Sequence, residues 1–111
     1  MMKTIVLIGL FALSLLPAFA GEPIPAGTIS EGSLTNEKLM MDAMIGVAQK
    51  VGASGCVEPE NFRPYIISMP EGKIGERSWS EHWVVQGCGK EFPVKIKFTE
   101  DGLDGANWII N

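Results

Sequence analysis

An export signal over residues 1–20 most constrains what this chain can fold into, because it sets both the compartment and the length of the folded part. Lys3 gives a positive start, residues 5–16 are almost wholly apolar, and the small residues Ala18 and Ala20 mark a cleavage site after Ala20. Removing 20 of the 111 residues leaves 91, enough for one domain with a marginal core. We therefore expect an exported protein, in the periplasm or outside the cell, that folds where thiols oxidise.

Two cysteines, Cys56 and Cys88, remain after the signal is removed, and they allow only one intramolecular pairing. A bridge between them closes a loop of about 32 residues, which the chain-entropy model credits with roughly 3–4 kcal/mol. A reactive thiol or a metal pair is the alternative. The chain has no Cys-x-x-Cys motif and one histidine, so a structural disulfide without a cofactor is the expectation.

The charge balance narrows the class of partner. Without Lys3 the chain has 8 basic residues against 13 acidic ones, a net charge of −5. Nucleic acid and anionic membrane carry the same sign, so neither is an expected partner. The apolar run of the signal is also shorter than the ~20 residues that span a bilayer, so we do not expect it to stay as a membrane anchor. No membrane attachment is expected after its removal. We expect a protein partner.

The best-supported element is a helix that starts near Thr35, the expected N-cap, with Leu34 and Leu39 as a hydrophobic staple. Apolar residues recur along it every four positions and predict a wide stripe that faces a core: Leu39, Ala43, Val47 and Val51, with Met40, Met44 and Ala48 beside them. Gly52 is expected to end the helix in a left-handed turn. Residues 21–33, which contain Pro23 and Pro25, are expected to be a flexible leader, or else a strap that lies along a partner.

Alternating apolar residues after Gly52 predict strands over residues 62–69, 77–86, 92–98 and 106–110. Short connections favour antiparallel neighbours, and the helix should cover the apolar face of the sheet. We therefore expect a single α+β domain over residues 34–111, with two layers: one helix packed on a three- to four-stranded antiparallel sheet.

Several motifs carry a resemblance. Trp79-x-x-x-Trp83-x-Val85, Cys88-Gly89, the strand of Phe92, Val94, Ile96 and Phe98, and Asp101-Gly102 resemble small exported bacterial proteins of uncharacterised function with a disulfide-linked, Trp-rich β-hairpin. The resemblance covers roughly residues 56–110 and implies a fold and export, without a catalytic role. The order of one helix and then consecutive strands is also similar in outline to cystatin-like domains. Their glycine-centred and Pro-Trp inhibitory loops have no match here, so no activity is transferred.

Two clusters suggest chemistry but are better explained as structure. His82 is the only histidine, and Ser80 shares its strand face, but Glu81 between them points to the other face and cannot orient the imidazole as a hydrolase triad requires. Glu100, Asp101 and Asp104 offer carboxylates for calcium, yet they are fewer than the six or more oxygens that calcium prefers, and Asp-Gly is itself a turn signal. We therefore expect no catalytic and no metal site, with calcium at these three residues as the alternative.

The three tryptophans leave two interpretations open. Trp79 and Trp83 share one face of a strand, and Trp108 could lie on a neighbouring strand. They either pack in the core or form an exposed platform for a glycan strand or a protein partner. Glu81 between them hints that part of that face is wet.

Our leading hypothesis for function is a small non-catalytic protein-interaction module, such as an inhibitor or an effector-type binder. The expected contact is either the loop 70–76 with Lys73 or the turn 87–90 with Lys90, and His82 could serve as a pH-dependent contact. The alternative is a carbohydrate- or peptidoglycan-binding module that uses the tryptophans. A small hydrolase centred on His82 comes third.

Overall fold

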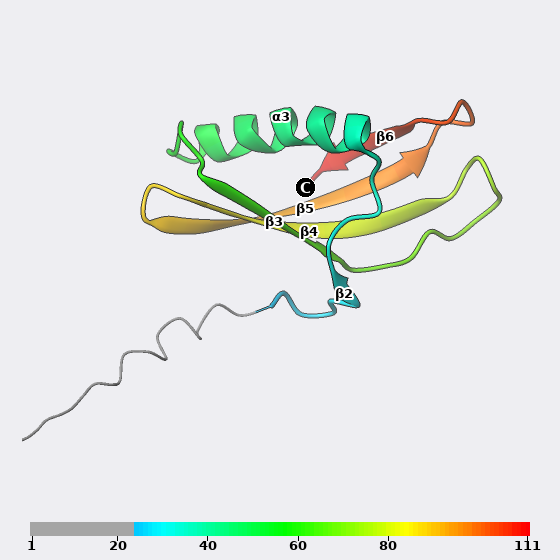
Figure 1. Cartoon of the computed structure of the whole chain (residues 1–111), viewed down its shortest axis with the longest axis horizontal. Helices are drawn as coiled ribbons and strands as arrows, with labels where there is room; N and C mark the ends of the chain where they lie inside the picture. Colours follow the sequence, from blue (N-terminus) through cyan, green and yellow to red (C-terminus); the bar gives the residue numbers. More distant parts are fainter. Residues whose placement is uncertain (1–23) are drawn as a thin grey trace, which may run out of the picture.

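A long β-hairpin forms the middle of the sheet, and one helix lies across the sheet's concave face (Figure 1). The computed structural model describes residues 24–111, so the expected export signal and its cleavage site lie outside the described residues. All neighbouring strands are antiparallel, in the order β2-β3-β4-β5-β6. The described elements are β2 (Ser30–Glu31), α3 (Glu37–Ala53), β3 (Asn61–Ile66), β4 (Ser78–Gly87), β5 (Lys90–Glu100) and β6 (Ala106–Ile110).

The α+β class is confirmed, but the sheet of the described region has five strands and not three to four. The additional strand is β2, which comes from the segment expected to be a leader and pairs with the end of β3. A two-residue strand has no periodicity, so alternation could not predict it. Strand β3 also ends earlier than expected, because the amides of Ile67 and Ser68 both donate to the carbonyl of Ser80 and form a bulge.

The helix has the expected stripe, and two details of its ends differ from expectation. The N-cap is Asn36 and not Thr35: the Asn36 side chain accepts a hydrogen bond from the Leu39 amide at 2.8 Å. The helix continues through Gly52 to Ala53, and the left-handed residue is Gly55, with φ of 110°.

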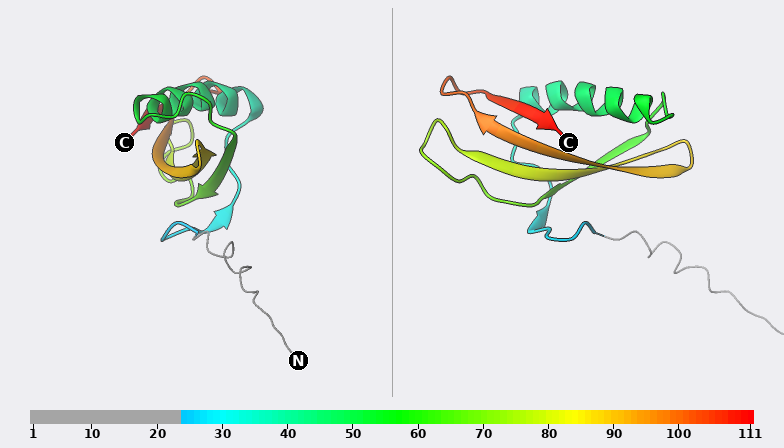
Figure 2. Two further views of the ribbon diagram at one scale, coloured as in Figure 1. Left: turned by 90° about the vertical axis from the view of Figure 1, so that its left-hand side faces the viewer. Right: turned by 180° about the vertical axis from the view of Figure 1, so that it is seen from behind.

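The core lies between the helix stripe and the inner face of the sheet, as the two views in Figure 2 show. Its buried side chains are Leu39, Ala43, Val47, Val51, Cys56, Trp79, Trp83, Val85, Val94, Ile96 and Phe98. The rings of Trp79 and Phe98 stack across β4 and β5 with centroids 5.1 Å apart. Gly46 lets the helix approach β6, because a methyl group there would overlap the Trp108 ring.

The expected disulfide between Cys56 and Cys88 is present and ties the chain after the helix to the β4–β5 turn. Their Cα atoms are 5.8 Å apart, within the range that the bond requires. Cys88 and Gly89 both have positive φ, as a two-residue type I′ hairpin turn needs. A Cβ atom at Gly87 would lie only 2.9 Å from the Pro59 Cα and 3.0 Å from the Cys56 sulfur, so a side chain there would displace the segment that carries the disulfide.

Candidate functional site

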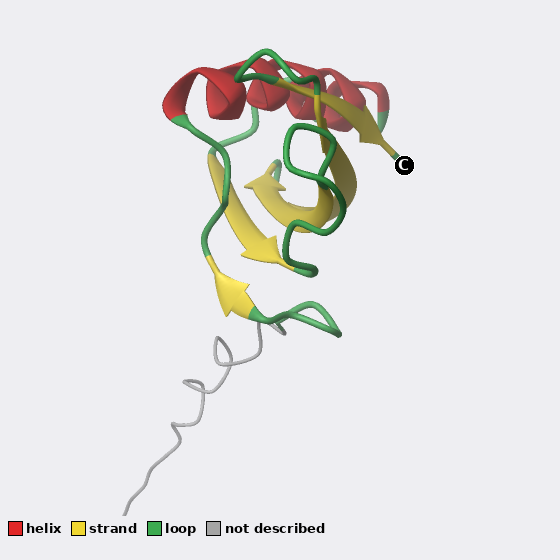
Figure 3. Cartoon of the chain, turned by 90° about the vertical axis from the view of Figure 1, so that its right-hand side faces the viewer, coloured by secondary structure: helices red, strands yellow, loops and turns green. Residues whose placement is uncertain are grey.

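Two loops meet at the end of the sheet opposite the disulfide, and we call residues 67–77 and 101–105 together the loop end (Figure 3). The first loop connects β3 to β4, and the second connects β5 to β6. The register places Ser78 opposite Thr99, so both loops leave the same end of the central hairpin. Gly75 and Gly102 lie next to each other where the loops meet, and both have a positive φ, 92° and 81°, which favours glycine.

A single carboxylate fastens the first loop to the start of the second. Glu100 Oε1 accepts hydrogen bonds from the amides of Gly75 and Arg77, each at 2.9 Å, and from Arg77 Nε at 3.0 Å. Glu100 Oε2 accepts from Arg77 Nη2 at 2.8 Å, so the guanidinium binds in the two-pronged manner that fixes orientation as well as distance. We call this arrangement the Glu100 clasp.

The clasp has a clear electrostatic signature. The hydrogen bond from the Arg77 side chain, helped by the backbone amides of Arg77 and Gly75, lowers the pKa of Glu100 from 4.5 to about 2. The same hydrogen bond and the charge of Glu100 raise the pKa of Arg77 above its ordinary value. Both groups are therefore charged at neutral and mildly acidic pH, where the ion pair of the clasp persists.

The second loop is held by its own first residue. Asp101 Oδ1 accepts from the amides of Leu103 and Gly105 at 2.7 and 3.1 Å, and the Asp101 amide donates to the Gly105 carbonyl at 3.0 Å. Asp104 adopts a positive φ of 66° within this turn. Both loops thus have backbone conformations fixed by internal hydrogen bonds.

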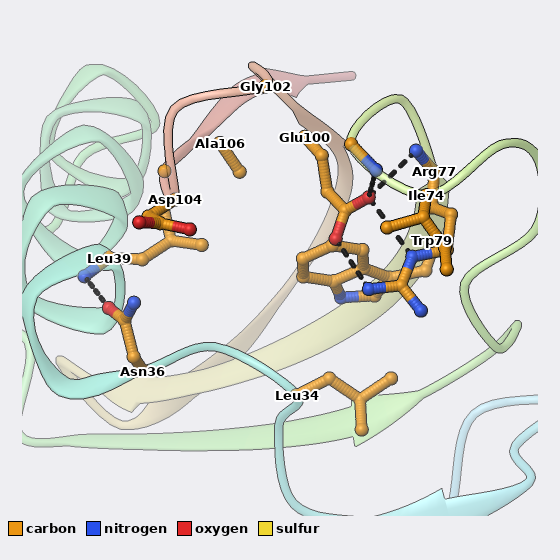
Figure 4. A pocket seen from close by; sticks show the side chains of 12 residues that line it. Leu34, Asn36, Leu39, Ile74, Arg77, Trp79, Glu100, Gly102, Asp104 and Ala106 are labelled. Carbon is orange, nitrogen blue, oxygen red and sulfur yellow. Dashed lines mark hydrogen bonds and ion pairs between the residues drawn. The ribbon is translucent and has the colours of Figure 1, made fainter.

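The tips of these fixed loops bear exposed apolar side chains. Ile74 is 87% exposed and Leu103 is 84% exposed, the two highest values among the large hydrophobic residues of the loop end. A cavity of about 480 Å³ lies between the loop end and the start of α3. Figure 4 shows the side chains that line it, Ile74 among them. Leu34, Leu39 and Trp79 form its apolar wall. The arrangement can accept an apolar partner surface without any loop having to become ordered first.

The residues expected to make contacts are divided between the two ends of the molecule. Lys73 is exposed in the loop 67–77 and belongs to the loop end, whereas Lys90 is exposed in the β4–β5 turn beside the disulfide (Figure 1). Residues 70–76 and 87–90 therefore cannot contact one small partner surface together. The sequence did not predict the roles of Ile74, Leu103 and the Glu100 clasp. Alternation of apolar residues locates strands, but it does not show which strand ends, and therefore which loops, lie side by side.

The tryptophans and Glu81 form a buried polar centre. Trp79 and Trp83 are 7% and 0% exposed, and Trp108 is half-buried against Gly46. The hint that Glu81 marks a wet face is wrong, because the residue is only 1% exposed. Its carboxylate accepts from the indole Nε1 atoms of Trp79 and Trp83, both at 2.8 Å, and these bonds replace the water it would otherwise need.

Glu81 also holds the start of the domain. Its two oxygens accept from the Ser33 hydroxyl at 2.7 Å and from the Leu34 amide at 2.8 Å. All four donors to the carboxylate are uncharged. The motif Trp-x-Glu-x-Trp, which places three side chains on one strand face, was the sequence signal for the indole part of this network; Ser33 and Leu34 could not be inferred from it.

His82 lies on the outer face of the sheet, away from the helix, opposite Lys95 on β5 and Tyr65 on β3. Burial, and secondly the charge of Lys95, lower the pKa of His82 below 6.5. Its Nε2 atom is buried and has no hydrogen-bond partner within residues 24–111. Because the Glu81 carboxylate is held by the tryptophans on the other face, it does not orient His82.

Two of the three carboxylates considered for calcium, Glu100 and Asp101, are engaged in other roles. Glu100 is used by the clasp, and Asp101 Oδ1 by the backbone of its own turn. Across the described part of the chain, no group of three or more histidine, cysteine, aspartate or glutamate side chains is arranged to hold a metal ion.

Comparison with known proteins gives no match to a family model, a curated protein or a solved structure. Within residues 24–111, the single helix is neither long enough nor apolar enough to cross a membrane. The disulfide suggests a non-cytoplasmic environment.

Proposed function

We propose that this protein is an exported, non-catalytic protein-binding module whose contact surface is the loop end. The observation that carries the proposal is a pair of fixed loops: the Glu100 clasp holds the first loop and Asp101 holds the second, while Ile74 and Leu103 project into solvent. Ordering a loop on binding costs free energy, so loops fixed beforehand bind more tightly for the same contact. An inhibitor or an effector-type binder is the form of module that such preformed apolar tips suit.

The experiment compares two surfaces of the mature protein. Partners are captured from culture medium and envelope extract, identified, and titrated with purified variants. The double variant Ile74→Asp/Leu103→Asp should weaken binding by at least about tenfold, since central apolar anchors commonly cost more than 1 kcal/mol each when lost. Val57→Asp is the matched control, because Val57 is 82% exposed but lies next to Cys56 at the other end of the molecule.

Binding that survives the double variant, or that is lost equally in Val57→Asp, would contradict the loop end as the contact surface. The glycan alternative is less well supported, because Trp79 and Trp83 offer no exposed ring face. The hydrolase alternative is also less well supported, because the described region places no hydrogen-bonded carboxylate beside His82.

A further inference from the structure

Strand β6 has one side without hydrogen-bond partners among the described residues. On its other side the Asn111 amide donates to the Lys95 carbonyl, and in the adjoining loop the Asp101 amide donates to the Gly105 carbonyl. These two bonds fix the ladder, because bonded and non-bonded pairs alternate along antiparallel strands. The amides and carbonyls of Ala106, Trp108 and Ile110 therefore point away from β5, towards the free edge of the sheet.

Within residues 24–111, this edge lacks the features that protect the other edges of the sheet, namely a covering strand or a proline. The outer side of β3 is partly covered by β2, and the unpaired half of β5 contains Pro93, which has no amide to offer. Strand β6 contains no proline, glycine or charged residue. It lies at the periphery beside α3 (Figure 3), and its Ile109 side chain is 63% exposed on the outer face.

The outer face next to this edge is basic, although the whole chain is acidic with a net charge of −4. Lys97 is exposed and has Ile109 on one side and Ser80 on the other. Lys95 is exposed as well, between Asn111 and His82. Neither lysine has a carboxylate beside it across the strands, so both ammonium groups are available to a strand added at β6.

We infer that β6 binds an extended segment of a partner protein that bears acidic side chains, by adding it to the sheet as a sixth strand. The three outward amides and carbonyls form main-chain hydrogen bonds with the added strand. The Ile109 side chain packs against those side chains of the added strand that lie on the same face of the sheet. Lys97 and Lys95 can lean across the edge towards carboxylates on the added strand. A second copy of this chain fits less well, because β6 carries no acidic residue to meet these lysines.

The test uses the mature protein and a synthetic seven-residue peptide of alternating glutamate and valine, blocked at both ends. Amide hydrogen exchange is followed by NMR. Saturation with the peptide should slow exchange at Ala106, Trp108 and Ile110 by at least about tenfold, because their amides gain acceptors. Asn107 and Ile109 should change little, since the ladder already uses their amides.

Charge variants test the acidic preference. Lys97→Glu should weaken peptide binding roughly three- to tenfold, whereas Lys50→Glu, an equal charge reversal at an exposed position in the last turn of α3, should not. A peptide with lysine in place of glutamate should bind more weakly. The inference is overturned if the three amides gain no protection, or if the lysine peptide binds as well. It is also overturned if the same amides become protected without peptide as protein concentration rises, because the occupant is then a second copy.

Discussion

Replacing Glu81 by leucine should destabilise the protein by about 2–4 kcal/mol, although it puts an apolar residue into an apolar core. The carboxylate is 1% exposed and accepts from four donors, two of which are the indole N–H groups of Trp79 and Trp83. Without the carboxylate, both buried indole N–H groups lose their acceptor, which costs about 1–3 kcal/mol of stability for each. Burial of the apolar leucine side chain offsets part of this loss.

Urea unfolding with the disulfide intact measures this change. In thermal unfolding of a chain of this size, each kcal/mol corresponds to roughly 4–8 °C, so a fall in Tm of at least about 8 °C is also expected. Glu81→Gln should lower stability by less, about 1–3 kcal/mol. The glutamine side-chain oxygen can still accept hydrogen bonds, whereas its NH₂ group points at N–H and O–H donors to which it cannot bond. Glu71→Gln, at an exposed position, should stay within about 0.5 kcal/mol. If Glu81→Leu also stays within that limit, the network does not hold the core together.

Other predictions concern the helix, the clasp and the disulfide. Gly46→Ala should destabilise by about 1–3 kcal/mol in thermal unfolding, against helix propensity, because the new methyl group overlaps the Trp108 ring; a rise in Tm would contradict the close packing. The pKa of Glu100 is about 2 in the folded protein and 4.5 ordinarily, so its stabilisation is complete above about pH 4.5 and is lost as pH falls towards 2. Glu100→Gln should remove that part of the acid sensitivity, as urea midpoints at about pH 5 and about pH 2.5 would measure; an unchanged difference would refute the clasp. Cys56→Ala/Cys88→Ala should lower the free energy of unfolding by roughly 3–4 kcal/mol in urea, and a loss under about 1 kcal/mol would refute the cross-link's role.

The sequence predicted those elements that depend on local patterning. The helix stripe of Leu39, Ala43, Val47 and Val51 is buried as its spacing indicated, and the strand over 106–110 has the expected bounds. The position of the N-cap depends on more than local pattern. Thr35 and Asn36 are both good cap residues, and in the fold the Thr35 hydroxyl bonds Ser33 while Asn36 takes the cap.

Features that join distant segments were not predicted. Ser33 lies 48 residues from Glu81, and Arg77 lies 23 residues from Glu100, so neither contact has a periodic signal. A carboxylate in a strand is normally solvated, which is why Glu81 suggested a wet face. The four donors that overturn this expectation come partly from a segment that was expected to be a leader.

The rigidity of the loop end is the central claim, and ¹⁵N relaxation of the free mature protein tests it most directly. With the Glu100 clasp closed, the backbone amides of Ile74 and Leu103 should have order parameters near about 0.85, like those of the strands. Values below about 0.6 at these two residues would mean that the apolar tips move freely, and the proposed preformed binding surface would not exist.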